Sequence, residues 1–399
     1  MATVVISPCN VVNSIDVGGH FLVYMQYAQA LRRLGCDVYW LERFRSSGDQ
    51  DQDANRLGTF LKRMERYGMG GKTILYTSCE QQDKQGNDRL DQRQYIGVTT
   101  ERANAVFRRA DLLLNFQYAI DPALLSRFRR TALVDIDPGL LQFWIATGQL
   151  LVPQHDLYFS TGETVGTPSA RFPDCGLPWI HIRPPICLEL WPYTYNPNCE
   201  AFTTVSSWWG ETDWITIDKR IIYVNTKRAS FLDFVELPRG TSQVIELALF
   251  LGEGDEEDRQ ILEGHGWRIR HSREVGATPE MYQSYIQQSR GEFSCAKPSC
   301  MKFQNAWISD RTLCYLASGK PVVVQNTGPS SFLPNGEGMF RFSTPDEAAD
   351  ALATINAAYE RHCRVAREIA EAYFDSRRIL ERILSIALHQ GARPCGASG

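Results

Sequence analysis

Residues 309–328 constrain the fold of this chain more than any other stretch. Ser309 is a good N-cap for a helix, and Asp310 stands in the first turn, where the helix dipole favours a negative charge. Apolar side chains at helical spacing follow and end at Gly319, a residue typical of helix ends. The valines at 322–324 then predict a buried parallel strand with a glycine turn after it. Helix, parallel strand and turn form one unit of an α/β sheet, whose ligands bind beyond the strand ends.

The same alternation begins at the N-terminus. Residues 3–7 and 36–41 are predicted strands, joined by a loop that contains Gly18 and Gly19 and by the helix that follows it. No Gly-x-Gly-x-x-Gly precedes that helix, so the dinucleotide fingerprint is not met. A polar surface loop at 45–55 is expected before a helix at 57–67.

The domain boundary is predicted from composition. Residues 81–94 are rich in Gln, Asp, Lys and Asn and indicate a solvated excursion. Prolines and asparagines between residues 184 and 198 indicate a linker, and strands at 202–205, 221–225 and 245–250 are expected to form a second sheet. We therefore predict two α/β domains, residues 1–196 and 197–399. A final helix from 362 to about 389 could cross back onto the first domain.

Length and composition fit an ordinary globular protein of two domains. A chain of 399 residues is too long for one typical core, and 22% charged residues are unremarkable for this class. The net charge of -4 gives no electrostatic reason to expect nucleic acid. No apolar run is long enough for a transmembrane segment, and no signal peptide or Cys-x-x-Cys pair is present. We expect a cytoplasmic protein with reduced cysteines; its oligomeric state stays open.

Two α/β domains imply a cleft between the sheets, which is a usual ligand site. That pattern fits periplasmic-type binding proteins, epimerases and glycosyltransferases equally well. Residues 316–323, Leu-Ala-Ser-Gly-Lys-Pro-Val-Val, resemble the signature in the C-terminal domain of GT-B glycosyltransferases, particularly the retaining family-4 type and its CgeB-like relatives. Residues 291–297 and 333–338 extend the resemblance. Many family-4 enzymes carry a ribose-binding glutamate where Cys314 stands, so here that contact is absent or supplied elsewhere.

The resemblance implies a GT-B architecture of two Rossmann-like, doubly wound domains that face a cleft. The second domain would bind a nucleotide sugar, for example a UDP-sugar, and the first an unidentified acceptor. The resemblance also implies retention of anomeric configuration and a reaction that needs no metal ion or other cofactor. The sequence leaves the donor sugar and the acceptor open.

The donor diphosphate requires cations and amide donors around it. Lys297 follows a predicted strand and matches the family's basic residue, with a solvated surface lysine as the alternative. Lys227 and Arg228 follow another strand, and for them binding and a solvated role are equally open. Arg311 opposes the helix dipole, which suggests an anionic partner, either Asp310 or the donor phosphate. Two glycines in the first domain and the turn after residue 325 could approach the phosphates. The expected donor-binding residues are Gly18, Gly19, Lys227, Arg228, Lys297, Asp310, Arg311, Thr327 and Gly328.

Two residues are candidates for acceptor chemistry. His20, at the start of the first helix, is either a helix-end histidine or a group that faces the acceptor. Glu163 lies in a glycine-bounded loop after a strand, where a carboxylate could orient a hydroxyl or act as a base. The alternative for Glu163 is a turn residue that caps its own loop. We take His20 and Glu163 as the catalytic candidates.

Asp135 and Asp137 have the Asp-x-Asp spacing of some metal-binding sites, and both lie on one face of a predicted strand. They lie in the first domain, however, whereas GT-B donors bind the second. Acceptor binding or loop capping is therefore expected there, and no metal. Two other functions stay open: a GT-B-fold sugar-nucleotide epimerase, and a catalytically silent binding or scaffold protein, which Cys314 favours.

Overall fold

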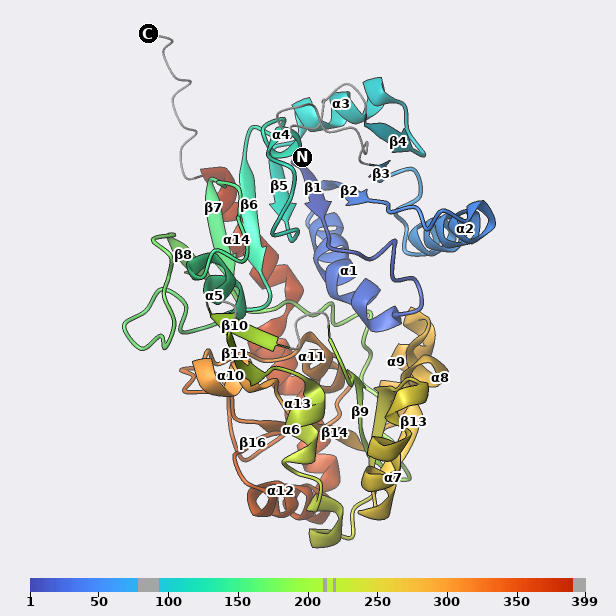
Figure 1. Ribbon diagram of the computed structural model, residues 1–399, viewed down its shortest axis with the longest axis vertical. Helices are drawn as coiled ribbons and strands as arrows, with labels where there is room; N and C mark the ends of the chain where they lie inside the picture. Colours follow the sequence, from blue (N-terminus) through green and yellow to red (C-terminus); the bar gives the residue numbers. More distant parts are fainter. Residues whose placement is uncertain (78–92, 211–213, 218–219, 390–399) are drawn as a thin grey trace.

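The predicted strands assemble into two separate sheets in the computed structural model, one above the other in Figure 1. The structure describes residues 1–77, 93–210, 214–217 and 220–389. Residues 81–92 of the predicted polar excursion lie outside these ranges. Its last residue, Gln94, begins a short strand that runs to residue 96.

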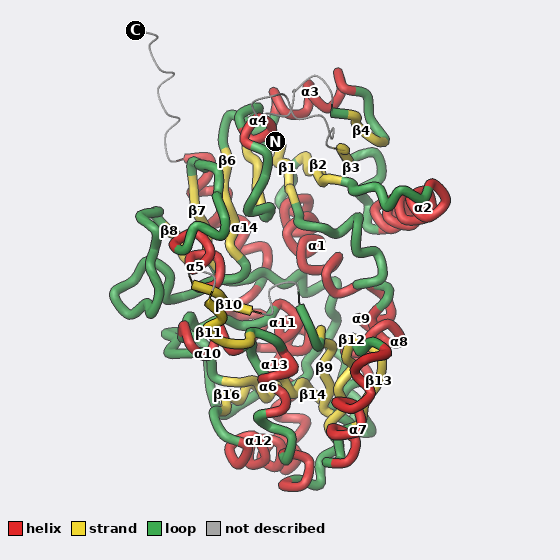
Figure 2. The backbone as a smooth tube through the Cα atoms, viewed as in Figure 1, coloured by secondary structure: helices red, strands yellow, loops and turns green. Residues whose placement is uncertain are grey.

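The first sheet has eight strands in the order β4-β3-β2-β1-β5-β6-β7-β8. Every neighbouring pair is parallel except β3 and β4. Its inner strands are apolar on both faces because helices cover the sheet on both sides; Figure 2 shows these helices in red. The strands are β1 (Thr3–Ser7), β2 (Asp37–Arg43), β3 (Thr73–Thr77), β4 (Gln94–Ile96), β5 (Leu112–Asn115), β6 (Thr131–Asp135), β7 (Leu157–Ser160) and β8 (Trp179–His181). The helices are α1 (Gly18–Arg33), α2 (Gln50–Arg66), α3 (Thr100–Arg109), α4 (Pro122–Leu125) and α5 (Leu140–Ala146).

The second sheet has six parallel strands in the order β13-β12-β9-β14-β15-β16. Its strands are β9 (Phe202–Ser207), β12 (Ile245–Phe250), β13 (Arg268–His271), β14 (Gly291–Ser294), β15 (Val322–Gln325) and β16 (Met339–Phe342). Its helices are α6 (Lys227–Leu232), α7 (Glu256–Gly264), α8 (Ser272–Gly276), α9 (Pro279–Gln288), α10 (Pro298–Phe303), α11 (Asp310–Ala317) and α12 (Pro345–Ala357). The stretch 310–325 therefore forms the predicted helix and parallel strand.

The expectation that residues 221–225 join the second sheet is wrong. They form β11 (Arg220–Val224), which pairs antiparallel with β10 (Trp214–Ile217) in a separate hairpin. The physical reason lies in β9, which already pairs with β12 on one side and β14 on the other. Strand β11 therefore cannot pair with β9, the sheet strand that precedes the hairpin, and it pairs with β10 instead.

The N-terminus of α1 lies against the second domain. A Cβ atom on Gly18 would lie 2.2 Å from the carbonyl group of Thr278, and one on Gly19 would lie 2.8 Å from the ring of Tyr282. Both glycines therefore allow α1 to approach α9 closely. One apolar core continues across this contact and includes Met25 of α1 and Ile286 of α9. The two sheets thus share a core on this side of the molecule.

The C-terminal segment returns to the first domain, but as two helices and not one. Helix α13 (Tyr359–Ile369) passes through a π-helical turn, Ala370–Phe374, and α14 (Ser376–His389) follows after a bend at Asp375. Asp375 pairs with Ile186, and α14 packs on α1 beside the first sheet (Figure 1). The last strand of the first sheet ends at His181 and the first strand of the second begins at Phe202; the division at residue 196 stays a prediction.

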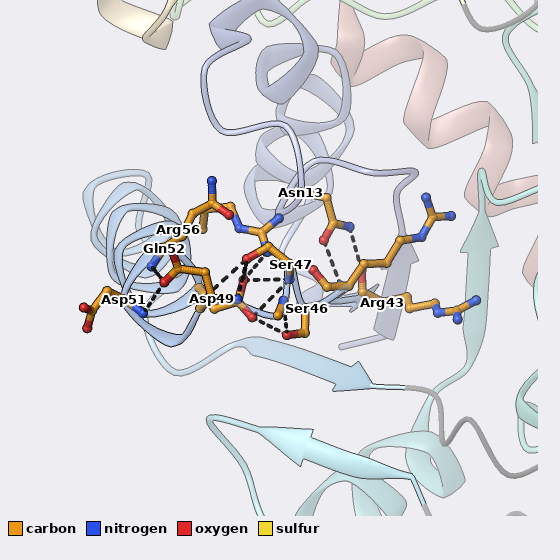
Figure 3. Close-up of polar contacts among 11 residues, drawn as sticks. Asn13, Arg43, Ser46, Ser47, Asp49, Asp51, Gln52 and Arg56 are labelled. Atoms are coloured by element: carbon orange, nitrogen blue, oxygen red, sulfur yellow. Dashed lines mark hydrogen bonds and ion pairs between the residues drawn. The ribbon is translucent and has the colours of Figure 1, made fainter.

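The loop between β2 and α2 shows why helix α2 begins at Gln50 and not near residue 57. The side chain of Asp49 accepts hydrogen bonds from the amides of Asp51 and Gln52, at 3.0 and 3.1 Å (Figure 3). Asp53 binds Ser46 and Ser47 and pairs with Arg56. These polar residues, predicted to be a loop, cap the helix and form its first turns.

Candidate functional site

The two domains meet where strands of both sheets end. The side-chain amide of Asn305, in the second domain, donates to the carbonyl of Pro138, which follows β6. Glu163, which follows β7, binds Ser330 and Ser331 in the loop after β15. Ligands of parallel α/β sheets gather at such carboxyl ends, so functional groups are expected there.

Three cations at this edge, Lys227, Lys297 and Arg341, have no carboxylate partner among the described residues; Arg341 donates instead to the side chain of Asn326 and to the carbonyl of Gly328. The ammonium group of Lys227 is buried, donates to the carbonyl of Cys295 and lies 5.9 Å from the ring centroid of Trp307. Burial, together with the nearby charges of Arg311 and Lys297, lowers the pKa of Lys227 to about 8. Lys297 is half-buried at the N-cap of α10. Within the described ranges, neither lysine forms an ion pair.

Arg228 and Arg311 are instead paired with carboxylates. Arg228 makes two bonds to Asp258, at 2.5 and 2.7 Å. Arg311 is buried; its Nε donates to Glu292 at 2.8 Å, and its other nitrogens donate to Ser294 Oγ at 2.6 Å and to the carbonyl of Val205 at 2.9 Å. The carboxylate that pairs with Arg311 is therefore Glu292 and not Asp310.

A pocket opens at the ends of β14 and β15. Ala296, Trp307, Ser309, Thr327 and the cation Arg341 contribute to its lining, whereas Lys227 and Lys297 do not. The hydroxyl of Thr327 donates to the carbonyl of Trp307 at 2.6 Å, which ties the turn to the preceding loop. The amide of Gly328 donates to the side chain of Asn326 at 3.2 Å and is therefore already used. Cys314 is buried in the core, with its thiol bonded to the carbonyl of Asp310, so it faces no ligand.

His20 and Asp310 face each other across the domains. The Nε2 atom of His20 donates to the carbonyl of Cys9 at 2.7 Å, which makes Nδ1 the basic nitrogen of a neutral ring. Enclosure by protein lowers the pKa of His20, and the bond to Cys9 opposes that change only in part. Asp310 has solvent-accessible surface, but the surrounding protein takes away part of the water that would hydrate its carboxylate, and this raises the pKa of Asp310. The charges of Arg311 and His20 stabilise the carboxylate and oppose this rise only in part.

The two carboxylates of the Asp-x-Asp segment have different surroundings. Asp135 is fully buried and accepts bonds from Gln142 at 2.9 Å, from Ser160 at 2.7 Å and from the amide of Asp137 at 2.9 Å. Burial raises its pKa to about 6. Asp137 is exposed, and one of its oxygens lies 3.1 Å from the hydroxyl of Tyr118. Its charge reaches both His20 and Asp310, so all three groups share one region between the domains.

Glu163 lies at the interdomain contact rather than in its own turn. Its carboxylate accepts three bonds from Ser330 and Ser331, at 2.5 to 2.7 Å. Burial would raise its pKa, but these bonds outweigh burial and lower it. The expectation that Glu163 could cap its own loop is therefore wrong, because it caps a loop of the second domain.

Two groups of this region, Trp307 beside Lys227 and Tyr118 beside Asp137, were not among the candidates drawn from the sequence. Asp137 was named only as one half of the Asp-x-Asp pair, for which acceptor binding or loop capping was expected. The only local signal was the position of Asp137 directly after a buried strand. The structure brings Lys227 and Lys297 together and groups His20 with Asp310, whereas Glu163 lies at a separate contact.

The fold was compared with those of known proteins. No protein-family model and no curated protein sequence matches the chain. Among solved structures, the Anabaena protein HepE in complex with UDP-glucose is 14% identical with a TM-score of 0.58, over 97% of this chain and 99% of that one. Sucrose-phosphate synthase from Thermosynechococcus elongatus is 11% identical with a TM-score of 0.56, over 97% and 98%.

A glycosyltransferase from Rickettsia africae is 9% identical with a TM-score of 0.56, over 98% of this chain and 99% of that one. This chain has the GT-B fold. The two-sheet architecture predicted from the sequence is confirmed; the family-4 assignment within the GT-B fold stays a prediction.

Two further properties concern the described part of this GT-B chain. No group of three or more His, Cys, Asp or Glu side chains there is arranged to hold a metal ion. None of its helices combines the length and the apolar character that crossing a bilayer requires.

Proposed function

We propose that the protein transfers a sugar from a nucleoside-diphosphate sugar to an acceptor. One observation carries this proposal: Lys227 and Lys297 converge at the strand ends of the second domain with no carboxylate partner among the described residues. A buried ammonium group is costly unless an anion accompanies it. The diphosphate of a nucleotide sugar supplies that anion.

The surroundings of the lysines support a phosphate ligand. Asn225 precedes Lys227 by two residues; its side-chain oxygen accepts from the amide of Ser299 at 2.8 Å, which orients the nitrogen. That nitrogen is buried and has no hydrogen-bond partner within the described ranges. A bound phosphate oxygen would satisfy it. Cations and amide groups of this kind can stabilise the departing diphosphate, so we propose a reaction without a metal ion.

The acceptor would bind on the first-domain side of the region between the domains, near His20 and Asp137. The neutral imidazole of His20 can take a proton at Nδ1, and Asp137 offers an exposed carboxylate to a hydroxyl group. Retention of configuration is proposed from the family-4 resemblance. UDP is the nucleotide to test first, because HepE was solved with UDP-glucose and the pneumococcal transferase GtfA with UDP.

A panel of nucleotide sugars tests the proposal. The full chain is mixed with the panel, washed, and the retained nucleotide identified by mass spectrometry. Transfer to an acceptor would support a glycosyltransferase. Conversion of the donor alone into an isomer would identify an epimerase, and binding without hydrolysis or transfer over a broad acceptor panel would identify a silent binding protein. If no nucleotide sugar is retained, the proposal fails.

A further inference from the structure

A second basic pocket lies between the end of β8 and the start of α14. It shares no lining residue with the pocket at the ends of β14 and β15. Three arginines line it, Arg183, Arg378 and Arg382. We propose that this pocket binds a phosphate group carried by a small molecule or a lipid, independently of the donor.

Arg183 is held in place by aromatic rings. Its guanidinium carbon lies 4.3 Å from the ring centroid of Phe332 and 5.3 Å from that of Tyr373. Stacking on ring faces fixes the guanidinium plane and leaves its N–H groups available at the edge of that plane. Arg183 lies two residues after β8, Phe332 in the loop after β15 and Tyr373 in the π-helical turn, so segments far apart in the sequence meet at Arg183.

Arg378 and Arg382 extend the pocket along α14. They stand four residues apart, which places both on one face of the helix, and both are exposed. Neither has a carboxylate partner in the part of the chain that the structure describes. The adjacent Arg377 differs, because its Nε pairs with Glu381 at 3.2 Å. Like charges at this spacing repel, so the arrangement is unfavourable without an anion between them.

Size and charge point to a phosphate. The cavity has a volume of about 210 Å³, the space of roughly seven water molecules. Asp375 also lines it, with one oxygen bonded to the amide of Arg377 at 3.0 Å. Three guanidinium groups and one carboxylate leave a formal charge of plus two. Guanidinium groups bind phosphate oxygens in bidentate pairs, and Ile182 and Ile379 offer apolar surface to attached carbon atoms.

Inorganic phosphate is the first probe, measured by calorimetry on the full chain. The starting variant carries Lys227→Met and Lys297→Ala, so that phosphate cannot use the proposed donor site and the two proposals fail separately. Adding Arg378→Ala and Arg382→Ala should weaken phosphate binding by at least about tenfold, because charge-assisted bonds are lost. Arg377→Ala, on the same helix, should leave the affinity within about twofold.

The outcomes are distinct. Sedimentation with phosphatidylcholine vesicles that contain phosphatidic acid, but not with vesicles that lack it, would identify a lipid headgroup if the arginine substitutions abolish it. Phosphate binding without vesicle binding would identify a soluble ligand. Absence of both, an affinity that the double arginine variant leaves unchanged, or an equal loss in Arg377→Ala would overturn the proposal.

Discussion

Each domain holds charged groups of two kinds at the ends of its strands. In the second domain Arg311 pairs with Glu292 and donates to three protein oxygens in all, whereas Lys227 and Lys297 have no acidic partner in the described chain. In the first domain Asp135 is buried and accepts from four donors, whereas Asp137 is exposed. A charged side chain whose hydrogen-bond partners are all protein groups stabilises the sheet. A charge without such partners is available to a ligand.

Substitution of Arg311, the cation paired with Glu292, should give the largest effect on stability. Arg311→Met leaves the carboxylate of Glu292 buried and unpaired, so we expect the free energy of unfolding to fall by about 3–5 kcal/mol. Urea unfolding of the variant measures it. The matched control is Arg311→Met with Glu292→Leu, which removes both charges and should recover most of the loss. A loss below about 1 kcal/mol in the single variant, as for a surface ion pair, would show that the pair of Arg311 and Glu292 does not support the sheet.

The unpaired lysines should affect binding and not stability. Lys297→Ala and Lys227→Met should each weaken UDP binding by about 1.5–3 kcal/mol, the value of a hydrogen bond to a charged group. In Lys227→Met the free energy of unfolding should fall by no more than about 1 kcal/mol, the value of the lost bond to the carbonyl of Cys295, because the substitution also removes the cost of a buried charge. Lys302→Ala, on the exposed face of the same helix as Lys297, is the control for calorimetry. Unchanged affinity in either lysine variant would exclude that lysine from the site.

The lowered pKa of Lys227 gives a smaller, pH-dependent effect. The pKa of the folded group is about 8, whereas an ordinary lysine has a pKa of 10.5. Between these values the unfolded chain binds the proton and the folded chain does not, so stability rises with pH across this window. Affinity for UDP should move the other way and fall by at most about tenfold from pH 7 to 9, because only the ammonium form attracts the diphosphate. Lys227→Met should show neither trend; a wild-type affinity that is flat with pH would contradict the assignment.

The sequence predicted the elements better than their partners. Apolar runs and helix caps are local, so the alternating strands and helices of both domains could be predicted. The sequence presents Arg311 and Lys297 alike, as cations expected at the donor diphosphate. Only the fold places Glu292, nineteen positions earlier, beneath Arg311. Glu163 likewise meets Ser330 through the packing of two domains, which no local pattern records.

The departures in secondary structure have the same origin. Strand β11 does not lie beside β9, because β12 and β14 pair with the two sides of β9, and both come from residues farther along the sequence. The final helix bends at Asp375 because that residue pairs with Ile186. The start of α2 is the exception, since the cap at Asp49 is local and could have been recognised.

Asp137 provides the last and smallest test, on the acceptor side. Asp137→Asn keeps the shape of the side chain and its contact with Tyr118 but removes the charge, so a bound hydroxyl would lose about 1 kcal/mol, the difference between a charge-assisted and a neutral hydrogen bond. The KM for the acceptor found in the panel should then rise about fivefold while UDP affinity stays unchanged. Asp135→Asn is the contrasting variant: it loses acceptors inside the sheet, so it should lower the free energy of unfolding and leave the acceptor KM alone. If Asp137→Asn leaves that KM within twofold, Asp137 only caps its loop. If instead kcat falls by roughly 10²-fold or more at constant KM, Asp137 moves a proton and does not merely hold the acceptor, and the unpaired carboxylate belongs to the chemistry itself.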